Sequence, residues 1–413
     1  MAARGARALK QPPLSLEAAQ ARLLALVSPL PFERTDIAGA LGRYLSAPLT
    51  ARRTQPAADL SAMDGYAVSA DDVAGPWQVI GESAAGHPFK GAVSPGSAVR
   101  ISTGALIPEG AGSVIVQEDV EREGDRVRLT GDGPDPAGRH IRECGLDFCE
   151  GGPLLEPGTR IGPAQAALAI TAGHKHLPVR RKPRVVILDT GDELCPEDER
   201  CAAHQTPASN GPMLAALAAT VPCEIRRMGP VPDHLDSLAE ALALAQDADV
   251  LVTSGGASAG DHDLIRPALE AWGATIDFWR IAIKPGKPLL VATRQHEGKT
   301  QVIIGLPGNP ASSYVTAYLF LLPLLRALLG AARPLPLRFR TLLAAPLAAG
   351  GSRREFLRAT WDGTSVTAQA RQDSGILAAL AASNALIDRP AGAPAAAAGD
   401  EVFAYLLENG GIA

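Results

Sequence analysis

Between residues 184 and 330 the chain repeats one pattern three times: a short apolar run that ends in a loop of glycine, proline and small polar residues. Short apolar runs bounded by such loops are typical of buried strands. In an open parallel sheet, ligands bind outside the carboxyl ends of the strands. The three loops therefore predict one cleft at one edge of a sheet, rich in backbone N–H groups. The runs are 185–188, 250–252 and 302–304, and the loops are 190–193, 253–263 and 306–310.

We expect several domains, because the chain has 413 residues and single cores rarely grow beyond about 250–300 residues. Strands and helices alternate around the three loops, which predicts a doubly wound α/β domain. Short strands separated by glycine-rich turns predict two all-β parts, one of them an insertion within a helical/linker domain that includes a helix over 14–45. The predicted domains are an N-terminal helical/linker domain (1–50 and 143–180), an inserted small β domain (51–142), the α/β domain (181–330) and a C-terminal, β-barrel-like domain (331–413).

Composition argues against several classes of protein. The net charge of −5 gives no electrostatic reason to expect a nucleic acid or an anionic membrane as a partner. Five cysteines without a Cys-x-x-Cys pair favour reduced thiols and a cytoplasmic location over a disulfide framework or a structural zinc site. Residues 314–330 are very apolar, but Pro323 and Arg326 interrupt them, so we expect a buried helix and no membrane span.

Three carboxylates stand where the predicted strands give way to loops or helices, and each has an ordinary structural explanation. Asp233 is a plausible N-cap of a helix over 234–245, Asp263 a plausible cap of the next helix, and Glu193 a solvated loop residue. The functional alternative is a Mg²⁺ site, because this ion needs only one or two carboxylates when a substrate supplies phosphate oxygens.

Positive charge and a helix start complete the predicted cleft. Lys284 and Lys287 lie in the motif Lys-Pro-Gly-Lys-Pro. Asn309 and Pro310 are typical of an N-cap followed by the first helical position. The N-terminus of a helix attracts anions. Together with the carboxylates, these residues favour a phosphorylated, anionic ligand.

A rival hypothesis is a serine hydrolase. Residues 256–260 read Gly-Ala-Ser-Ala-Gly after an apolar run, which matches the nucleophile-elbow pattern around Ser258. Asp277 and His296 follow in the required order. However, no helix begins at once after this segment, and His296 lies in a predicted hairpin turn, so the match is the weaker hypothesis.

Eight short motifs, taken together and in order, resemble the molybdopterin molybdotransferases of molybdenum-cofactor biosynthesis, the family that includes the C-terminal domain of gephyrin. Each motif is weak alone, but their order and distances along the chain exclude chance. They are Ser-Ala-Met-Asp-Gly-Tyr-Ala-Val (61–68), Ser-Thr-Gly-Ala (102–105), Ile-Arg-Glu-Cys-Gly-Leu-Asp (141–147), Thr-Gly-Asp-Glu-Leu (190–194), Ser-Asn (209–210), Thr-Ser-Gly-Gly-Ala-Ser-Ala-Gly-Asp-His-Asp (253–263), Ile-Lys-Pro-Gly-Lys-Pro (283–288) and Gly-Leu-Pro-Gly-Asn-Pro (305–310).

The resemblance implies an elongated homodimer with a molybdopterin-binding α/β domain. Its active cleft would lie between the α/β domain of one subunit and the inserted β domain of the other. The implied reaction joins molybdate to adenylylated molybdopterin, the last step of cofactor synthesis, with Mg²⁺-dependent release of AMP. A molybdopterin adenylyltransferase and molybdoenzyme maturation factors are candidate partners. A paralogue that inserts tungsten and an added scaffolding role stay open.

The resemblance also implies roles for residues, position by position. The catalytic set is Asp64, Thr103, Arg142 and Asp147 from the side of the inserted domain, with Glu193, Lys284 and Lys287 from the α/β side. The residues that would bind the cofactor are Thr190, Gly191, Ser254, Gly255, Gly256, Ser258, Pro307, Gly308 and Asn309. The metal ligands would be Asp233, Asp263 and Glu193. The C-terminal domain matches the family only loosely, so a role for Ser374 stays open.

Overall fold

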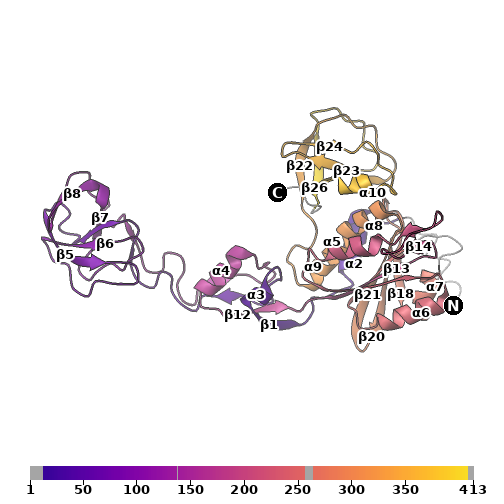
Figure 1. Cartoon of the computed structure of the whole chain (residues 1–413), viewed down its shortest axis with the longest axis horizontal. Coiled ribbons are helices and arrows are strands. Elements are labelled where there is room, and N and C mark those ends of the chain that lie inside the picture. Colours follow the sequence, from indigo (N-terminus) through magenta and orange to yellow (C-terminus); the bar gives the residue numbers. More distant parts are fainter. Residues whose placement is uncertain (1–12, 137, 256–263, 408–413) are drawn as a thin grey trace.

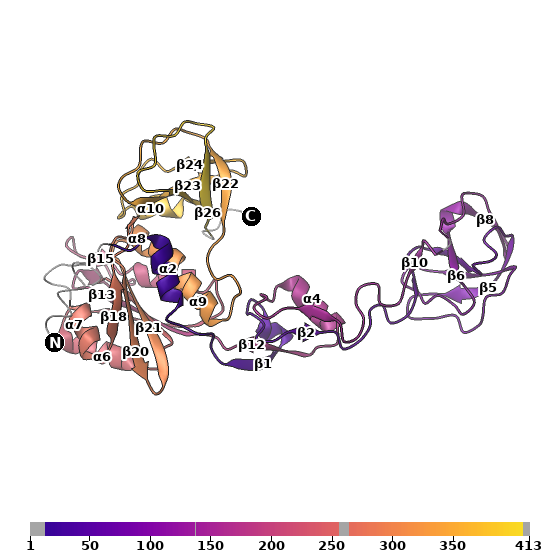
Figure 2. The same ribbon diagram turned by 180° about the vertical axis from the view of Figure 1, so that it is seen from behind.

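The computed structural model describes residues 13–136, 138–255 and 264–407, and the structural statements below concern these residues. The chain is elongated, with a small β lobe at one end and the α/β and C-terminal domains at the other (Figure 1). A narrow linker domain separates them, and both views show the same arrangement (Figure 2). The inserted β lobe therefore lies far from the α/β domain of its own chain.

The α/β domain is built on one six-stranded sheet in the order β16-β13-β17-β21-β20-β18. Strands β16, β13, β17 and β21 run parallel, as the repeated pattern predicts, and β20 runs antiparallel between β21 and β18. The sheet is thus mixed at one side. Its strands are β13 (Arg184–Thr190), β16 (Glu224–Val231), β17 (Val250–Ser254), β18 (Thr275–Trp279), β20 (Leu290–His296) and β21 (Lys299–Leu306).

Helices cover both faces of this sheet, because the central strands are apolar on both sides. Successive side chains of a strand point to opposite faces, so Val185 and Ile187 enter one core while Val186 and Leu188 enter the other. The first face carries α2 (Leu16–Leu24), α5 (Asn210–Ala218), α8 (Pro310–Thr316) and α9 (Leu322–Leu328), and the second carries α6 (Leu235–Leu244) and α7 (Ile265–Ala271).

The apolar segment after residue 309 is one continuous helix in which a π-helical turn, η2 (Ala317–Leu321), joins α8 to α9. It is long and apolar enough to cross a membrane, but 89% of its most apolar window is buried inside the protein. The prediction of a buried helix is confirmed.

The π-helical turn precedes Pro323, which has no N–H to donate to the carbonyl four residues earlier. That carbonyl belongs to Leu319, and the side-chain amide of Gln20 donates to it at 2.8 Å. Gln20 is itself buried on α2. Helix α2 is therefore fastened to the core helix by a hydrogen bond that replaces the one proline removes.

The predicted helix over 14–45 is wrong beyond Leu24. Helix α2 ends there, and β1 (Phe32–Asp36) and the one-turn helix α3 (Ile37–Ala40) follow. Pro29 and Pro31 lie between, and proline cannot continue a helix interior. Helix α2 packs on the α/β core, although the sequence placed it in the linker domain. The other linker elements are β2 (Leu49–Thr50), β11 (Pro153–Leu155), α4 (Pro163–Thr171) and β12 (His176–Arg180).

The inserted lobe is a six-stranded sheet with an apolar cluster on each face. A two-residue pairing of β3 with β10 lies where the chain enters and leaves this lobe. The strands are β3 (Leu60–Ser61), β4 (Gly65–Val68), β5 (Trp77–Ser83), β6 (Ser97–Ile101), β7 (Ser113–Val116), β8 (Val120–Glu123), β9 (Arg126–Leu129) and β10 (Ile141–Arg142), with the 3₁₀ helix η1 (Gln117–Asp119) between β7 and β8.

The C-terminal domain is a small closed barrel, because β23 pairs with both β24 and β25 in a sheet of order β23-β24-β22-β26-β25. One further strand, β19 (Ile283–Lys284), leaves the α/β domain and pairs with β23. The barrel elements are β22 (Arg338–Leu343), β23 (Arg354–Trp361), β24 (Ser365–Ala368), α10 (Leu377–Ala381), β25 (Ala385–Arg389) and β26 (Glu401–Leu406), and the short strands β14 (Leu194–Cys195) and β15 (Thr206–Pro207) pair beside the α/β sheet.

We predict that Gln20→Met weakens the docking of α2. The substitution keeps the side-chain length but leaves the Leu319 carbonyl buried without a donor, at a cost of about 1–3 kcal/mol. Hydrogen exchange should show the loss as reduced protection of the amides in η2 and α9. Gln246→Met, at an exposed glutamine, is the control and should change nothing. Equal protection in the two variants would show that the Gln20 hydrogen bond contributes no stability.

Candidate functional site

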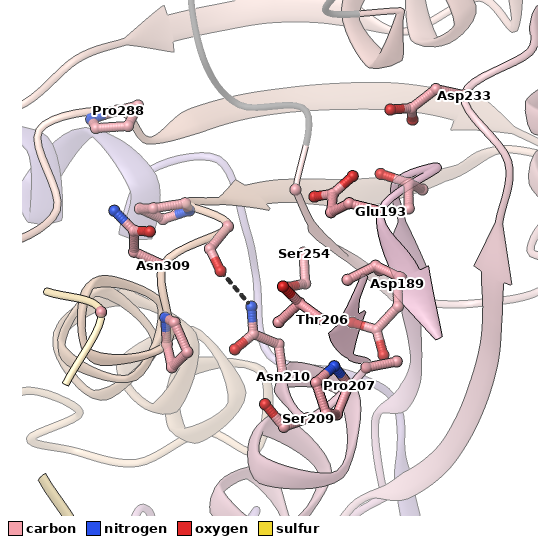
Figure 3. A pocket seen from close by; sticks show the side chains of 18 residues that line it. Asp189, Glu193, Thr206, Pro207, Ser209, Asn210, Asp233, Ser254, Pro288 and Asn309 are labelled. Atoms are coloured by element: carbon pink, nitrogen blue, oxygen red, sulfur yellow. Dashed lines mark hydrogen bonds between the residues drawn. The ribbon is translucent and has the colours of Figure 1, made fainter. Parts of the chain in front are cut away.

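A pocket of about 540 Å³ lies at the carboxyl ends of the parallel strands, where the sequence predicted a cleft. Asp189, Ser254 and Leu306 are register partners on β13, β17 and β21, so the loops that follow them leave the sheet side by side. Figure 3 shows the pocket between these loops. Eight residues of the predicted site line it: Thr190, Glu193, Asp233, Ser254, Gly255, Pro307, Gly308 and Asn309.

One wall of the pocket is acidic. Glu193 and Asp233 lie on the same side of it (Figure 3). The backbone N–H of Asp233 donates to Oδ1 of Asp192 at 3.0 Å, so a third carboxylate is held beside them. Burial, followed by repulsion from Asp192 and Glu193, raises the pKa of Asp233. Concentrated negative charge of this kind favours binding of a cation.

The structure contradicts the interpretation of Asp233 as a helix cap. The N-cap of α6 is His234, the helix begins at Leu235, and no side chain makes a capping hydrogen bond there. The side chain of Asp233 instead lines the pocket. Among the residues that the structure describes, no group of three His, Cys, Asp or Glu side chains is close enough to hold a metal on its own. Asp263, the third predicted ligand, lies outside the described residues, as do Gly256 and Ser258.

Two glycines keep the pocket walls close together. Gly255 has φ +99°, and a Cβ there would lie 2.5 Å from the Thr190 carbonyl oxygen. At Gly211, on α5, a Cβ would lie 2.1 Å from Oδ2 of Asp189. Any larger residue would push these loops or this carboxylate away. Gly191 follows Thr190 and donates its N–H to the Val231 carbonyl at 3.2 Å.

The loop before α8 is shaped by side chains from two other elements. Asn309 is the N-cap residue and Pro310 the first helical residue, as predicted, but the Asn309 side chain makes no capping hydrogen bond. Its amide donates instead to the Ser374 hydroxyl of the C-terminal domain at 3.1 Å. On the opposite side, the Asn210 amide donates to the Gly308 carbonyl at 2.7 Å, the dashed line in Figure 3.

A second pocket, of about 560 Å³, adjoins the first and shares Pro288 and Asn309 with it. Lys284, Lys287 and Arg353 bring three positive charges to its lining, against one carboxylate from Asp373. The Lys284 ammonium group donates to Glu355 at 2.9 Å. This pocket lies between the α/β domain and the barrel, and its charge suits a small anion.

The inserted lobe holds the other predicted residues. The backbone N–H and the hydroxyl of Thr103 both donate to Oδ1 of Asp64, at 2.6 and 3.0 Å. The Thr103 backbone N–H is the largest cause of the lowered pKa of Asp64. Arg142 lies on β10, and the Asp147 N–H donates to the Gln55 carbonyl at 3.0 Å. Within one chain this group is remote from the α/β pocket (Figure 1).

Ser258, the nucleophile of the rival hydrolase hypothesis, lies outside the described residues, and only its two candidate partners can be placed. His296 ends the β20–β21 hairpin opposite Lys299, at the amino end of β21, whereas Gly255 lies at the carboxyl edge of the sheet. Asp277 is bound to Arg22 of α2 at 2.6 Å.

The sequence reasoning missed several residues that line the two pockets. Asp189 lies between the predicted apolar run (185–188) and the predicted loop (190–193) and was assigned no role, and Asn210 appeared only within a motif. Arg353 and Ser374 lie in the C-terminal domain, far along the chain from the loops that they face. The only signal for Arg353 was its neighbour Arg354, the first residue of β23, and a pair of adjacent arginines alone predicts nothing about a ligand.

Three family models cover most of the chain. The MoeA N-terminal region (domain I and II) matches residues 14–173, a probable molybdopterin binding domain matches 186–327, and the MoeA C-terminal region (domain IV) matches 340–407. The order of the three models follows the order of the lobes in the structure.

Whole proteins and solved structures agree with these models. A molybdopterin molybdenumtransferase of Synechococcus elongatus is 35% identical over 94% of this chain and 98% of its own length, and one from a Nostoc species is 36% identical over 73% and 70%. Gephyrin of Dictyostelium discoideum is 32% identical over 72% of this chain and 47% of its own length. A molybdopterin biosynthesis moeA protein from Pyrococcus horikoshii superposes with a TM-score of 0.82 at 27% identity, covering 96% of this chain and 100% of that one. The chain therefore belongs to the molybdopterin molybdenumtransferase family, the transferases of molybdenum-cofactor biosynthesis.

Proposed function

We propose that this protein inserts molybdate into adenylylated molybdopterin and releases AMP in a Mg²⁺-dependent step. The observation that carries the proposal is the pair of adjoining pockets with opposite charge. The acidic pocket suits a metal-bound phosphoanhydride, and the basic pocket suits a small oxyanion. Since the two share Pro288 and Asn309, an oxyanion in one would lie next to a ligand in the other.

Glu193 and Asp233 fit a magnesium ion, because Mg²⁺ binds through one or two carboxylates and takes its remaining oxygens from water and substrate phosphate. When bound, the ion would neutralise negative charge that develops on the phosphoanhydride. The chain's own part is to hold the two carboxylates on one wall, with Asp192 fixed behind them by the Asp233 backbone. No covalent nucleophile is needed for this reaction.

The basic pocket would bind and orient the oxyanion. Lys287 and Arg353 supply positive charge, and Lys284 is positioned by its ion pair with Glu355. Arginine and lysine make their strongest hydrogen bonds to anionic oxygens. The Asn309–Ser374 hydrogen bond joins the wall shared by the two pockets to the barrel. Tungstate has nearly the same size and charge as molybdate, so both anions belong in the assay.

A second copy of the chain would complete the site. Asp64 and Thr103 form a compact pair on the inserted lobe. Met63 and Leu106, close to them in sequence, and Leu146, next to Asp147, are large apolar residues that are exposed. Exposed apolar side chains beside polar ones are typical of interaction surfaces. We therefore propose a homodimer in which the inserted lobe of each subunit covers the α/β pocket of the other, and a cytoplasmic location for it.

We predict that Asp233→Asn lowers kcat for molybdate-dependent AMP release at least about tenfold, because one metal ligand loses its charge. EDTA should abolish AMP release by the wild-type chain, and added Mg²⁺ should restore it. Asp236→Asn, in the first turn of α6, is the matched control. Wild-type turnover in EDTA would remove the metal from the mechanism.

The basic pocket yields a second prediction. Lys287→Met should raise the KM for molybdate about tenfold while leaving the KM for adenylylated molybdopterin within about twofold. Lys299→Met, at an exposed hairpin lysine, serves as the charge control. An unchanged KM for molybdate in Lys287→Met would place the oxyanion elsewhere.

The shared site can be tested by mixing two inactive variants. Asp64→Asn alone and Asp233→Asn alone should each be nearly inactive. Mixed dimers would regain one intact site of two, so an equal mixture should recover about a quarter of wild-type activity. A mixture of Asp64→Asn with Thr103→Ala, both changed in the same half-site, should recover none. Absence of recovery in the first mixture, with subunit exchange verified, would contradict a site shared between subunits.

A further inference from the structure

Strand β13 carries a buried carboxylate that has no role in the proposed binding of the metal ion or of the oxyanion. Asp189 is 5% exposed and lines the acidic pocket. The Gly211 backbone N–H and the Ser254 hydroxyl donate to its carboxyl group, but its Oδ1 has no hydrogen-bond partner in the described structure. A buried acceptor without a donor destabilises the folded state, so a donor from a ligand would satisfy this oxygen.

A second unpartnered acceptor lies on the same pocket wall. The Asn210 amide must direct its NH₂ group toward the Gly308 carbonyl, because that carbonyl can only accept. The Asn210 Oδ1 is therefore the acceptor of this side chain, and it too is buried and without a partner among the described residues. One N–H of the Asn210 amide is used by this hydrogen bond. Asp189 and Asn210 thus each contribute an acceptor oxygen that still lacks a donor.

Both oxygens are held in place by backbone packing. Gly211 leaves just enough room for the Asp189 carboxylate, since a Cβ would lie 2.1 Å from Oδ2. Asn210 is the first residue of α5, next to Gly211, so the two acceptors lie on adjacent elements. Shielding from bulk water makes a hydrogen bond from a ligand to such groups both stronger and more selective.

We propose that Asp189 and Asn210 recognise the donor edge of the pterin ring, namely its 2-amino group and the adjacent ring N–H. This inference rests on the proposed function and names the part of the substrate that the pocket floor binds. Two neighbouring donors match two acceptors. The edge of adenine presents a donor beside an acceptor nitrogen, so the same pair would leave it mismatched. A site built to pair a polar group discriminates strongly against an analogue that lacks it.

The isosteric variant Asp189→Asn tests the proposal. Its amide oxygen can still accept from the Gly211 N–H, while its NH₂ group places a donor where the ligand's donors would bind. The probes are 6-hydroxymethylpterin, 6-hydroxymethyllumazine (which has an oxygen in place of the 2-amino group) and AMP, each measured by isothermal titration with the metal-free chain.

We expect the wild-type chain to bind the pterin at least about tenfold more tightly than the lumazine. Asp189→Asn should abolish or reverse that preference and leave the affinity for AMP unchanged. Asp247→Asn makes the same chemical change at an exposed aspartate beyond the opposite end of β17 and should keep the preference. If Asp189→Asn bound AMP more weakly but kept the preference for pterin over lumazine, Asp189 would be assigned to adenine and the proposal would be contradicted. Equal binding of pterin and lumazine by the wild type would also overturn it.

A thermal readout excludes simple misfolding of the variant. Burial raises the pKa of Asp189 to about 6. The positive charge of Arg227 lowers this pKa in part, and repulsion from Glu197 raises it further. A raised pKa of an acid means that the folded state binds more protons, so ionisation costs stability as pH rises through that range. Glu193 and Asp233 line the same pocket, whereas Gly211 and Ser254 contribute no charge. Asp189→Asn should therefore have a higher Tm than the wild type, by more at pH 8 than at pH 5.

Failure of this inference is distinguishable from failure of the proposed function. Molybdate-dependent AMP release by the wild type judges the proposed reaction, and the pterin-to-lumazine preference judges the role of Asp189. Turnover without that preference would leave the reaction in place and remove Asp189 and Asn210 from pterin recognition. A lower Tm for Asp189→Asn at pH 8 would show that the carboxylate stabilises the fold, which also contradicts the proposal.

Discussion

The register of three parallel strands determines the rest of the site. Asp189, Ser254 and Leu306 are paired across β13, β17 and β21, so three loops that are far apart in sequence start from one line. This common starting line brings the three loops together around the acidic pocket and places Gly255 close to the Thr190 carbonyl. A slip of one residue in any strand would turn its side chains to the other face and separate the loops.

The parts predicted best from sequence were those in which local pattern and tertiary environment agree. Strands buried on both faces are apolar throughout, so β13, β17 and β21 were recognisable, as was the buried helix after Asn309. Prediction of the helix over 14–45 was wrong because apolar spacing was followed past two prolines. Family motifs supplied the other functional residues, and those on the inserted lobe, such as Asp64, remain predictions.

The remainder depended on contacts that no local pattern records. By sequence Asp233 was the better candidate for the helix cap. In the structure His234 is the N-cap of α6, and the Asp233 N–H donates to Asp192. Asp189 directly follows the apolar run 185–188, where a single carboxylate carries no periodic signal. Arg353 and Ser374 reach the site because the barrel closes against the α/β domain. Their placement depends on pairing between segments about 70 residues apart, as in β19 with β23.

The pairing of β19 with β23 has a mechanical consequence. Lys284 belongs by its backbone to the barrel, through its register with Glu355. Three residues later the Lys287 carbonyl accepts from the Ile281 N–H, in the core of the α/β domain. The spacing of the two ammonium groups is thus tied to the angle between the domains. If the angle between the barrel and the α/β domain is fixed, the distance between the two ammonium groups is fixed as well, and so is the size of ion that both can contact. If that angle varies, the distance varies with it.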